Sequence, residues 1–140
     1  MDALEFLNTR VPLFAGLSEE VLFPLAKDSA LKQFAAGQAV LHAGMSVEQL
    51  HVVAVGSVGI HVKVPNKGVQ MIAELKSGDV FGETSMLDGS LAGATVKAGA
   101  EGAYVLLVPE GPFRALYQAN AEFRARLDAL VASRRAPPKP

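Results

Sequence analysis

The 140-residue chain contains no cysteine, and it contains no arginine between Arg10 and Arg114. The lack of cysteine excludes disulfide bonds, a thiol nucleophile and a zinc site built on thiolates. No apolar run is long enough to span a bilayer, and the first five residues are acidic where a signal peptide would be basic. We therefore expect a cytoplasmic protein that has no membrane partner.

The overall charge and composition further limit the classes of protein to which the chain can belong. The formal net charge of −1 gives no general reason to expect nucleic acid as a partner. Half of the residues are hydrophobic and 19% are charged, which is typical of a globular chain. A chain of this length forms one domain. No Ser-His-Asp order, Walker loop or paired-carboxylate spacing stands out, so we predict that the protein is not an enzyme and has no catalytic residues.

Both ends of the chain have helical patterns. Residues 1–30 are predicted to form an N-terminal helical segment, with one helix from Asp2 to Asn8 and another that begins after Ser18 as its N-cap. Residues 110–136 are predicted to form two C-terminal helices, followed by a Pro-rich tail at 137–140. The expected role of the arginines in the last helix is a solvated basic face, with a contact to an acidic partner as the alternative. These arginines are Arg124, Arg126, Arg134 and Arg135.

Residues 31–109 have the pattern of a β-structure. Many short strands separated by glycine turns predict an antiparallel sandwich or roll. The sequence Asn66-Lys67-Gly68 is a plausible hairpin tip, because Gly68 can adopt a positive φ. The predicted strands are Leu31–Phe34, Ala39–His42, Gln49–Val55, Ser57–Val64, Val69–Leu75, Val80–Phe81, Gly93–Ala98 and Ala103–Val108.

One stretch, residues 77–98, has the features of a ligand site. A turn and the sequence Phe81-Gly82-Glu83 precede one or two predicted helical turns from Thr84 to Leu87, and three small residues follow at 92–94. The first N–H groups of a helix have no partner inside the helix and favour an anion. A carboxylate at position 83 would repel a phosphate, but it suits a ligand with a hydroxyl beside its phosphate, as in a ribose.

This stretch resembles the phosphate-binding cassette of the cyclic nucleotide-binding domains of kinase regulatory subunits, gated channels and catabolite-activator transcription factors. The turn glycines Gly37, Gly44 and Gly56 also fall where that family places them, so the resemblance covers about residues 13–130. It implies a mainly β fold with flanking α: a jelly-roll-like, antiparallel double-stranded β-helix with N-terminal helices, a short cassette helix and two C-terminal helices. The matching residues are Gly78-Asp79-x-Phe81-Gly82-Glu83, Met86-Leu87 and Ala94-Thr95-Val96-x-Ala98.

The resemblance also implies roles for individual residues in the cassette, which spans 78–95. Glu83 takes the position that holds the ribose 2′-hydroxyl, and the N–H groups of Thr84 and Ser85 take the position that holds the phosphate. All three residues also suit plain helix capping. The hypothetical ligand-binding set is Phe81, Gly82, Glu83, Thr84, Ser85, Ala92, Gly93 and Ala94.

The arginine that pairs with the phosphate in that family falls on Ala92 and is absent. No alignment shift restores it, because the chain has no arginine between Arg10 and Arg114. The nearest cations are Lys76 and Lys97, and an ammonium cannot copy the paired hydrogen bonds of a guanidinium. Losing two charge-assisted hydrogen bonds weakens binding by about a hundredfold or more. Ordinary cAMP or cGMP binding is therefore predicted to be weak or lost. The small residues Gly93 and Ala94 suit a close approach by a ligand or, equally, a tight entry into a strand.

Several functions remain open from the sequence. We predict a stand-alone, non-catalytic regulatory protein in signalling that acts through an unknown protein partner, with a homodimer also considered and no certain cofactor. One alternative is a sensor in which a cyclic nucleotide or related ligand moves the C-terminal helix. Another is a truncated catabolite-activator-type transcription factor, which Pro137 and Pro138 disfavour by ending that helix. We expect no metal site, because His42, His51 and His61 lie in separate strands.

Overall fold

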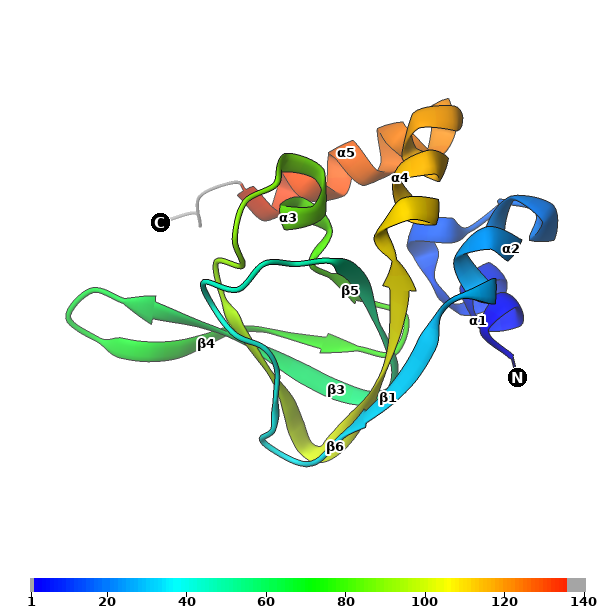
Figure 1. Cartoon of the computed structure of the whole chain (residues 1–140). Helices are drawn as coiled ribbons and strands as arrows, with labels where there is room; N and C mark the ends of the chain where they lie inside the picture. Colours follow the sequence, from blue (N-terminus) through cyan, green and yellow to red (C-terminus); the bar gives the residue numbers. More distant parts are fainter. Residues whose placement is uncertain (1, 136–140) are drawn as a thin grey trace.

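The protein is described by a computed structural model that covers residues 2–135, with side chains for residues 2–134. Its helices gather on one side of a β-roll (Figure 1). The N-terminal elements are α1 (Ala3–Arg10), the 3-10 helix η1 (Pro12–Phe14) and α2 (Glu19–Lys27). The short helix α3 (Glu83–Asp88) interrupts the strands, and α4 (Glu110–Ala119) and α5 (Ala121–Arg135) follow them.

The strands form one antiparallel sheet that is rolled on itself. The order is β1-β6-β3-β4, with β2 also paired to β6 and β5 also paired to β3. This arrangement confirms the predicted fold class, a mainly β roll with flanking helices. The strands are β1 (Ala30–Phe34), β2 (Ala39–Leu41), β3 (Gln49–Val64), β4 (Gly68–Lys76), β5 (Val80–Phe81) and β6 (Thr95–Pro109).

Two of the predicted strand breaks are wrong. The pairs Gln49–Val55 with Ser57–Val64 and Gly93–Ala98 with Ala103–Val108 are each one long, bent strand, β3 and β6. Glycine at 56 and at 102 has a positive φ, and the β3–β6 register shifts on either side of Gly56. Gly56 pairs with Ala103 and Val58 with Ala98, so β6 has the extra residues 99–102 at this bend while both strands continue beyond it. The glycines therefore mark bends and do not end the strands. β6 also begins at Thr95, two residues later than predicted.

The predicted helix starts at the N-terminus are confirmed by their caps. The Asp2 side chain accepts a hydrogen bond from the backbone N–H of Glu5 at 2.8 Å. Ser18 Oγ accepts one from the N–H of Val21 at 3.2 Å. Each side chain satisfies a backbone donor that the helix itself leaves unpaired.

The C-terminal helices pack on the N-terminal segment through aromatic rings. Phe123 of α5 stacks on Phe14 of η1 with ring centroids 5.5 Å apart, and Phe113 of α4 meets it edge-on at 6.0 Å. All three rings are fully buried. The predicted end of the last helix before Pro137, and the predicted tail, lie outside the described residues.

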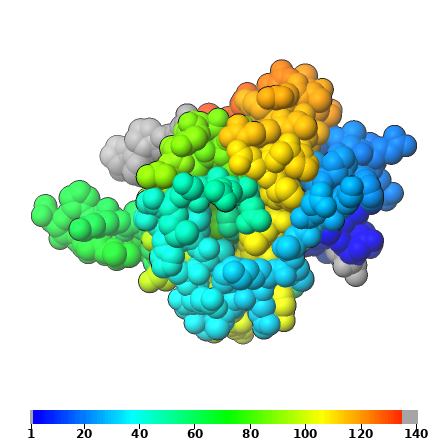
Figure 2. Space-filling model, in the orientation of Figure 1, coloured from blue at the N-terminus to red at the C-terminus, as the bar shows by residue number. Residues whose placement is uncertain are grey.

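The β3–β4 hairpin projects away from the rest of the molecule (Figures 1 and 2). Its tip is the predicted turn, with Gly68 at φ +74°. Among the described strands β4 pairs only with β3, and almost all of its residues are exposed. Among the described helices, none has the length and apolar character needed to cross a membrane.

Candidate ligand-binding site

The cassette begins with the short strand β5, which pairs with β3 at His51 and Val52. At its end Gly82 has φ +89° and acts as the N-cap of α3. A Cβ added at this glycine would lie 3.0 Å from Cγ1 of Val47. A larger residue would therefore combine a strained backbone with a close contact, and the glycine lets the chain turn sharply from the strand into the helix.

Glu83, the first residue of α3, is the most buried charged side chain of the site. Its exposed fraction is 1%. One carboxylate oxygen, Oε1, accepts a hydrogen bond from Nη1 of Arg134 at 2.5 Å. The other, Oε2, is buried and has no hydrogen-bond partner among the described residues. One oxygen of this buried carboxylate is therefore paired and the other is not. This is unusual, because buried polar atoms in proteins nearly always have a hydrogen-bond partner.

Arg134 is the site residue that sequence reasoning missed. It belongs to the last helix, α5, where a solvated basic face was expected, but it crosses to the cassette and pairs with Glu83. That expectation is wrong for Arg126 also, which donates to the carbonyl oxygens of Leu13 and Ala15 at 2.9 and 2.7 Å. The side chain of Arg135 lies outside the described residues.

Ala92, at the position of the family arginine, is packed into the loop between α3 and β6. Its N–H donates to the carbonyl of Met45 and its carbonyl accepts from the N–H of Gly44, both at 2.8 Å. Its exposed fraction is 8%. These contacts join the cassette loop to the loop between β2 and β3. The backbone at position 92 is therefore held in place, although this position lacks the charge of an arginine.

A cavity of about 350 Å³ lies between the cassette, the roll and α5. It is large enough for a small organic ligand. Arg134 and Glu83 are the charged residues among its described lining. All eight predicted site residues line it, and the full lining is Leu41, Val47, Ile60, Ile72, Ala73, Leu75, Phe81, Gly82, Glu83, Thr84, Ser85, Ala92, Gly93, Ala94, Val96 and Arg134.

The small residue Gly93 borders open space in this cavity. A Cβ added there would meet no heavy atom within 4 Å, and the residue has no positive φ. Nothing in the folded chain therefore requires a glycine at this position. The observation favours the interpretation in which small residues leave room for a ligand, over the one in which they permit a tight strand entry.

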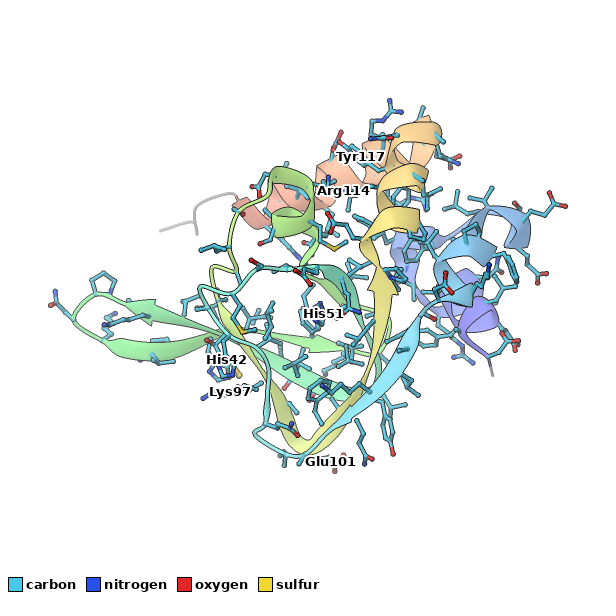
Figure 3. All side chains as sticks on the ribbon, in the orientation of Figure 1. His42, His51, Lys97, Glu101, Arg114 and Tyr117 are labelled. Carbon is cyan, nitrogen blue, oxygen red and sulfur yellow. The ribbon has the colours of Figure 1, made fainter. Side chains whose placement is uncertain are left out.

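His51 lies behind the cassette, inside the roll (Figure 3). Its ring stacks on Phe81 with centroids 4.7 Å apart. Burial lowers the pKa of His51 from 6.5 to about 4, and the nearby Gln49 backbone raises it by a smaller amount. Its Nδ1 is buried, and no described residue forms a hydrogen bond with it. The imidazole is therefore neutral at pH 7 and supports Phe81 from behind.

The other end of α3 is held by α4. Arg114, seen between α3 and α4 in Figure 3, donates from Nη2 to the backbone carbonyl of Met86. Its Nε donates to Glu110, one turn earlier in α4, at 2.6 Å. Residues from both C-terminal helices thus contact the cassette, with Arg114 at its helix end and Arg134 at its helix start.

The three histidines are not brought together. His42 and His51 lie apart in Figure 3, and across residues 2–134 no three His, Asp or Glu side chains gather as a metal site would need. Among the described residues that line the cavity, one acidic and one basic side chain are present, and they pair with each other.

A roll with a short-helix cassette and a cavity closed by a C-terminal helix defines a class of ligand-binding regulatory domains. The family model of the cyclic nucleotide-binding domain matches residues 31–120. The chain belongs to this family. A search of curated proteins finds no match to the chain.

Solved structures of the same class resemble the chain over most of its length. A cyclic nucleotide-binding domain from Methylobacillus flagellatus is 25% identical, with a TM-score of 0.75 over 94% of this chain and 75% of that one. The Thermus thermophilus catabolite activator protein is 27% identical, with a TM-score of 0.75 over 88% of this chain and 57% of that one. The regulatory domain of Toxoplasma gondii protein kinase A, solved with cAMP, is 19% identical and shares the fold, with a TM-score of 0.80 over 94% and 48%.

Proposed function

We propose that this chain is a cytoplasmic, non-catalytic regulatory domain whose binding of cAMP and cGMP is weak or lost. The relatives that support a regulatory role include a catabolite activator protein and a kinase regulatory domain. The single observation that carries the proposal is the charge arrangement of the cavity. Position 92 supplies no cation, and Arg134, the one cation among the described residues that line the cavity, already pairs with Glu83.

The physical reason is the number of favourable contacts left for a phosphate. Because the acid and the base of this cavity are paired with each other, no free positive charge is left to attract an anion. A bound anion would also lie close to the buried carboxylate, which repels it. A ribose hydroxyl would add at most one hydrogen bond to the Glu83 carboxylate. One neutral contact to a charged group does not replace the two charge-assisted bonds that an arginine at position 92 would make.

The test is a calorimetric titration of the chain with cAMP and cGMP, followed by the same titration of Ala92→Arg. We expect wild-type dissociation constants in the high micromolar range or weaker, and at least a tenfold gain for the variant because the cavity and the loop backbone are already in place. Ala92→Met is the matched control, since it adds bulk without charge and should give no gain. Tight binding by the wild type would contradict the proposal.

The contact between Arg134 and Glu83 favours a second candidate, a sensor that moves α5. A ligand that takes Glu83 for itself competes with Arg134 and so loosens the end of this helix; the shift can be no larger than the ligand's preference for the released state. Hydrogen exchange of residues 121–135 with and without saturating cAMP tests this function. Faster exchange in α5 supports a sensor, and unchanged exchange at saturation rejects it.

A further inference from the structure

A second cavity, of about 400 Å³, lies between α1 and the strands beside it (Figure 1). It shares no described lining residue with the cassette cavity. Phe6 of α1 lines one side, and the strands contribute Leu31 of β1, Val55 of β3 and Leu106 of β6. The volume is sufficient for a small organic ligand. We call this cavity the α1 groove.

The strand side of the α1 groove is apolar and reaches the protein surface. Leu31 and Val55 are both 58% exposed, and Tyr104 is 38% exposed. Leu31 pairs with Leu106 of β6. Val55 pairs with Tyr104, which lies two residues before Leu106 and so on the same face of β6. These apolar side chains are therefore contiguous, and covering them with the apolar chain of a ligand is favourable.

The charged groups of the α1 groove lie at opposite ends of α1. Arg10 is in the last turn of the helix, and Ser77 lines the groove beside it. The next residue, Gly78, comes so close that an added Cβ would collide with the backbone oxygen of Arg10. Asp2 is the N-cap of the same helix, whose eight residues separate the two charges by about 12 Å.

Arg10 has hydrogen-bonding capacity that the described residues do not use. None of them forms an ion pair or a side-chain hydrogen bond with its guanidinium. Asp2, by contrast, already accepts the N–H of Glu5, and the hydroxyl of Ser77 donates to the carbonyl of Ala54. A guanidinium has five N–H donors in a planar fork that matches a carboxylate. The α1 groove therefore offers a ligand an apolar wall with one available cation at its end.

We propose that the α1 groove binds an amphipathic monocarboxylate, a molecule with an unbranched apolar chain and one carboxylate. The carboxylate pairs with the guanidinium of Arg10, and the chain lies between Phe6 and the exposed side chains of Leu31 and Val55. Asp2 repels the anion at the other end and so fixes the direction of the chain. The inference goes beyond the proposed function, because it involves no residue of the cassette.

Three probes that share one apolar chain and differ in their headgroup test this inference: octanoate, 1-octanol and octylammonium. The full chain is titrated with each by calorimetry, and amide chemical shifts at the same ionic strength locate the site. We expect octanoate to bind at least tenfold more tightly than the other two, with shifts at residues 54–55, 77 and 106. A smaller preference, shifts confined to the cassette, or no binding of octanoate at millimolar concentration would overturn the inference.

One pair of variants tests the role of the cation. Arg10→Met should lower octanoate affinity at least tenfold and leave octanol affinity unaltered, because it removes the charge and keeps an apolar side chain. Lys27→Met is the matched control, since Lys27 is the basic residue in the last turn of α2 and lies outside the α1 groove. It should change neither affinity. Unaltered octanoate affinity in Arg10→Met would overturn the inference.

A second pair tests the apolar wall. Leu31→Ser should weaken octanoate and octanol alike, by at least threefold, and Phe23→Ser, an exposed apolar position on α2, should weaken neither. If Leu31→Ser has no effect on either probe, the chain does not lie in the α1 groove and the inference fails. Arg10 and Leu31 are both exposed, so the variants should fold. If one does not, the headgroup comparison on the wild type still decides the question.

Discussion

Arg134 neutralises a carboxylate that is otherwise cut off from solvent, so its removal should destabilise the fold. Its own side chain is one-third exposed, and that of Glu83 is almost fully buried. Arg134→Met leaves the buried carboxylate without its donor, and we expect the free energy of unfolding to fall by about 1–3 kcal/mol. Urea denaturation at pH 7 measures the change.

A matched control for this prediction is the surface pair of Lys76 and Glu74, whose charged atoms lie 3.7 Å apart. Both side chains are well exposed, so Lys76→Met should alter stability by no more than about 0.5 kcal/mol. Equal losses in the two variants would mean that the buried position of Glu83 gives its ion pair no special weight.

His51 makes the stability of the protein sensitive to acid. Its pKa is lowered from 6.5 to about 4 by burial, so the unfolded chain binds this proton more readily than the folded one. Above pH 6.5 the histidine therefore does not lower the free energy of unfolding. This free energy falls as the pH drops toward 4, and the loss is complete below pH 4. The loss by pH 4 is about 3 kcal/mol, because one pKa unit corresponds to about 1.4 kcal/mol.

The measurement is the free energy of unfolding of the wild type and of His51→Leu between pH 7 and pH 4. Carboxylates titrate in both proteins, so the difference between the two curves isolates the histidine. We expect the variant to lose about 3 kcal/mol less than the wild type over this range. His42→Gln, at an exposed position, should follow the wild-type curve. Parallel curves for His51→Leu and the wild type would contradict the prediction.

The sequence was sufficient to bring together the residues of the cassette but not the residue that balances them. Phe81 to Ser85 are adjacent in the chain, and their order alone indicates a turn from strand to helix. Arg134 lies 51 positions from Glu83, and only the packing of α5 on η1 and α4 brings the two together. A basic residue near the end of an amphipathic helix gives no local sign that it points at a buried acid.

At the scale of elements, the stability of the roll depends on the close approach of β3 and β6 where both strands bend. A Cβ added at Gly56 of β3 would lie 2.4 Å from the backbone oxygen of Gly102 in β6, and Gly56 also has φ +83°. Gly56→Ala should therefore lower the free energy of unfolding by at least about 2 kcal/mol. Thermal or urea unfolding checks this value.

Gly37 is the matched control for that variant. It has φ +75°, but an added Cβ would meet nothing within 4 Å. Gly37→Ala should cost only the backbone conformation, about 1 kcal/mol. If the two alanine variants are equally stable, the close approach of the strands at Gly56 is less tight than the structure shows.

The same bend explains why the element boundaries were predicted less well than the fold. Glycine between alternating stretches indicates a turn in most sequences, and here it indicates a bend within a strand, since the pairing of β3 with β6 continues on both sides. The helix starts were predictable because Asp2 and Ser18 cap them through local hydrogen bonds. Whether a strand ends or bends depends on its partner, which lies far away in the sequence.

At the scale of the whole molecule, α5 connects parts that are distant along the chain. Arg126 binds carbonyls at the N-terminal segment, Arg124 binds the carbonyls of Tyr117 and Gln118 at the end of α4, and Arg134 reaches the cassette. A single helix therefore contacts the N-terminal helices, the preceding helix and the ligand cavity. The ion pair of Glu83 and Arg134 joins the cassette directly to this helix.

The outermost strand is the edge at which we predict that a second copy of the chain pairs. β4 has one neighbour in the sheet, and Val69 and Met71 are 64% and 58% exposed. Between Gly68 and Leu75 it has neither lysine nor proline, the residues that commonly protect an edge. Antiparallel pairing of β4 with itself is self-complementary, as a two-fold dimer requires. We therefore expect concentration-dependent dimerisation through this edge.

Sedimentation velocity over a hundredfold range of concentration measures this association. Val69→Lys with Met71→Lys should shift the chain to the monomer, because two like charges on each edge would face those of the other copy. The same double substitution should leave the unfolding free energy nearly unaltered, since both side chains are exposed in the isolated fold. As a control, Phe23→Lys changes an exposed apolar residue on α2, distant in sequence from the edge strand, and should not affect the mass. A wild-type chain that remains a monomer at every concentration would remove β4 as a self-pairing edge.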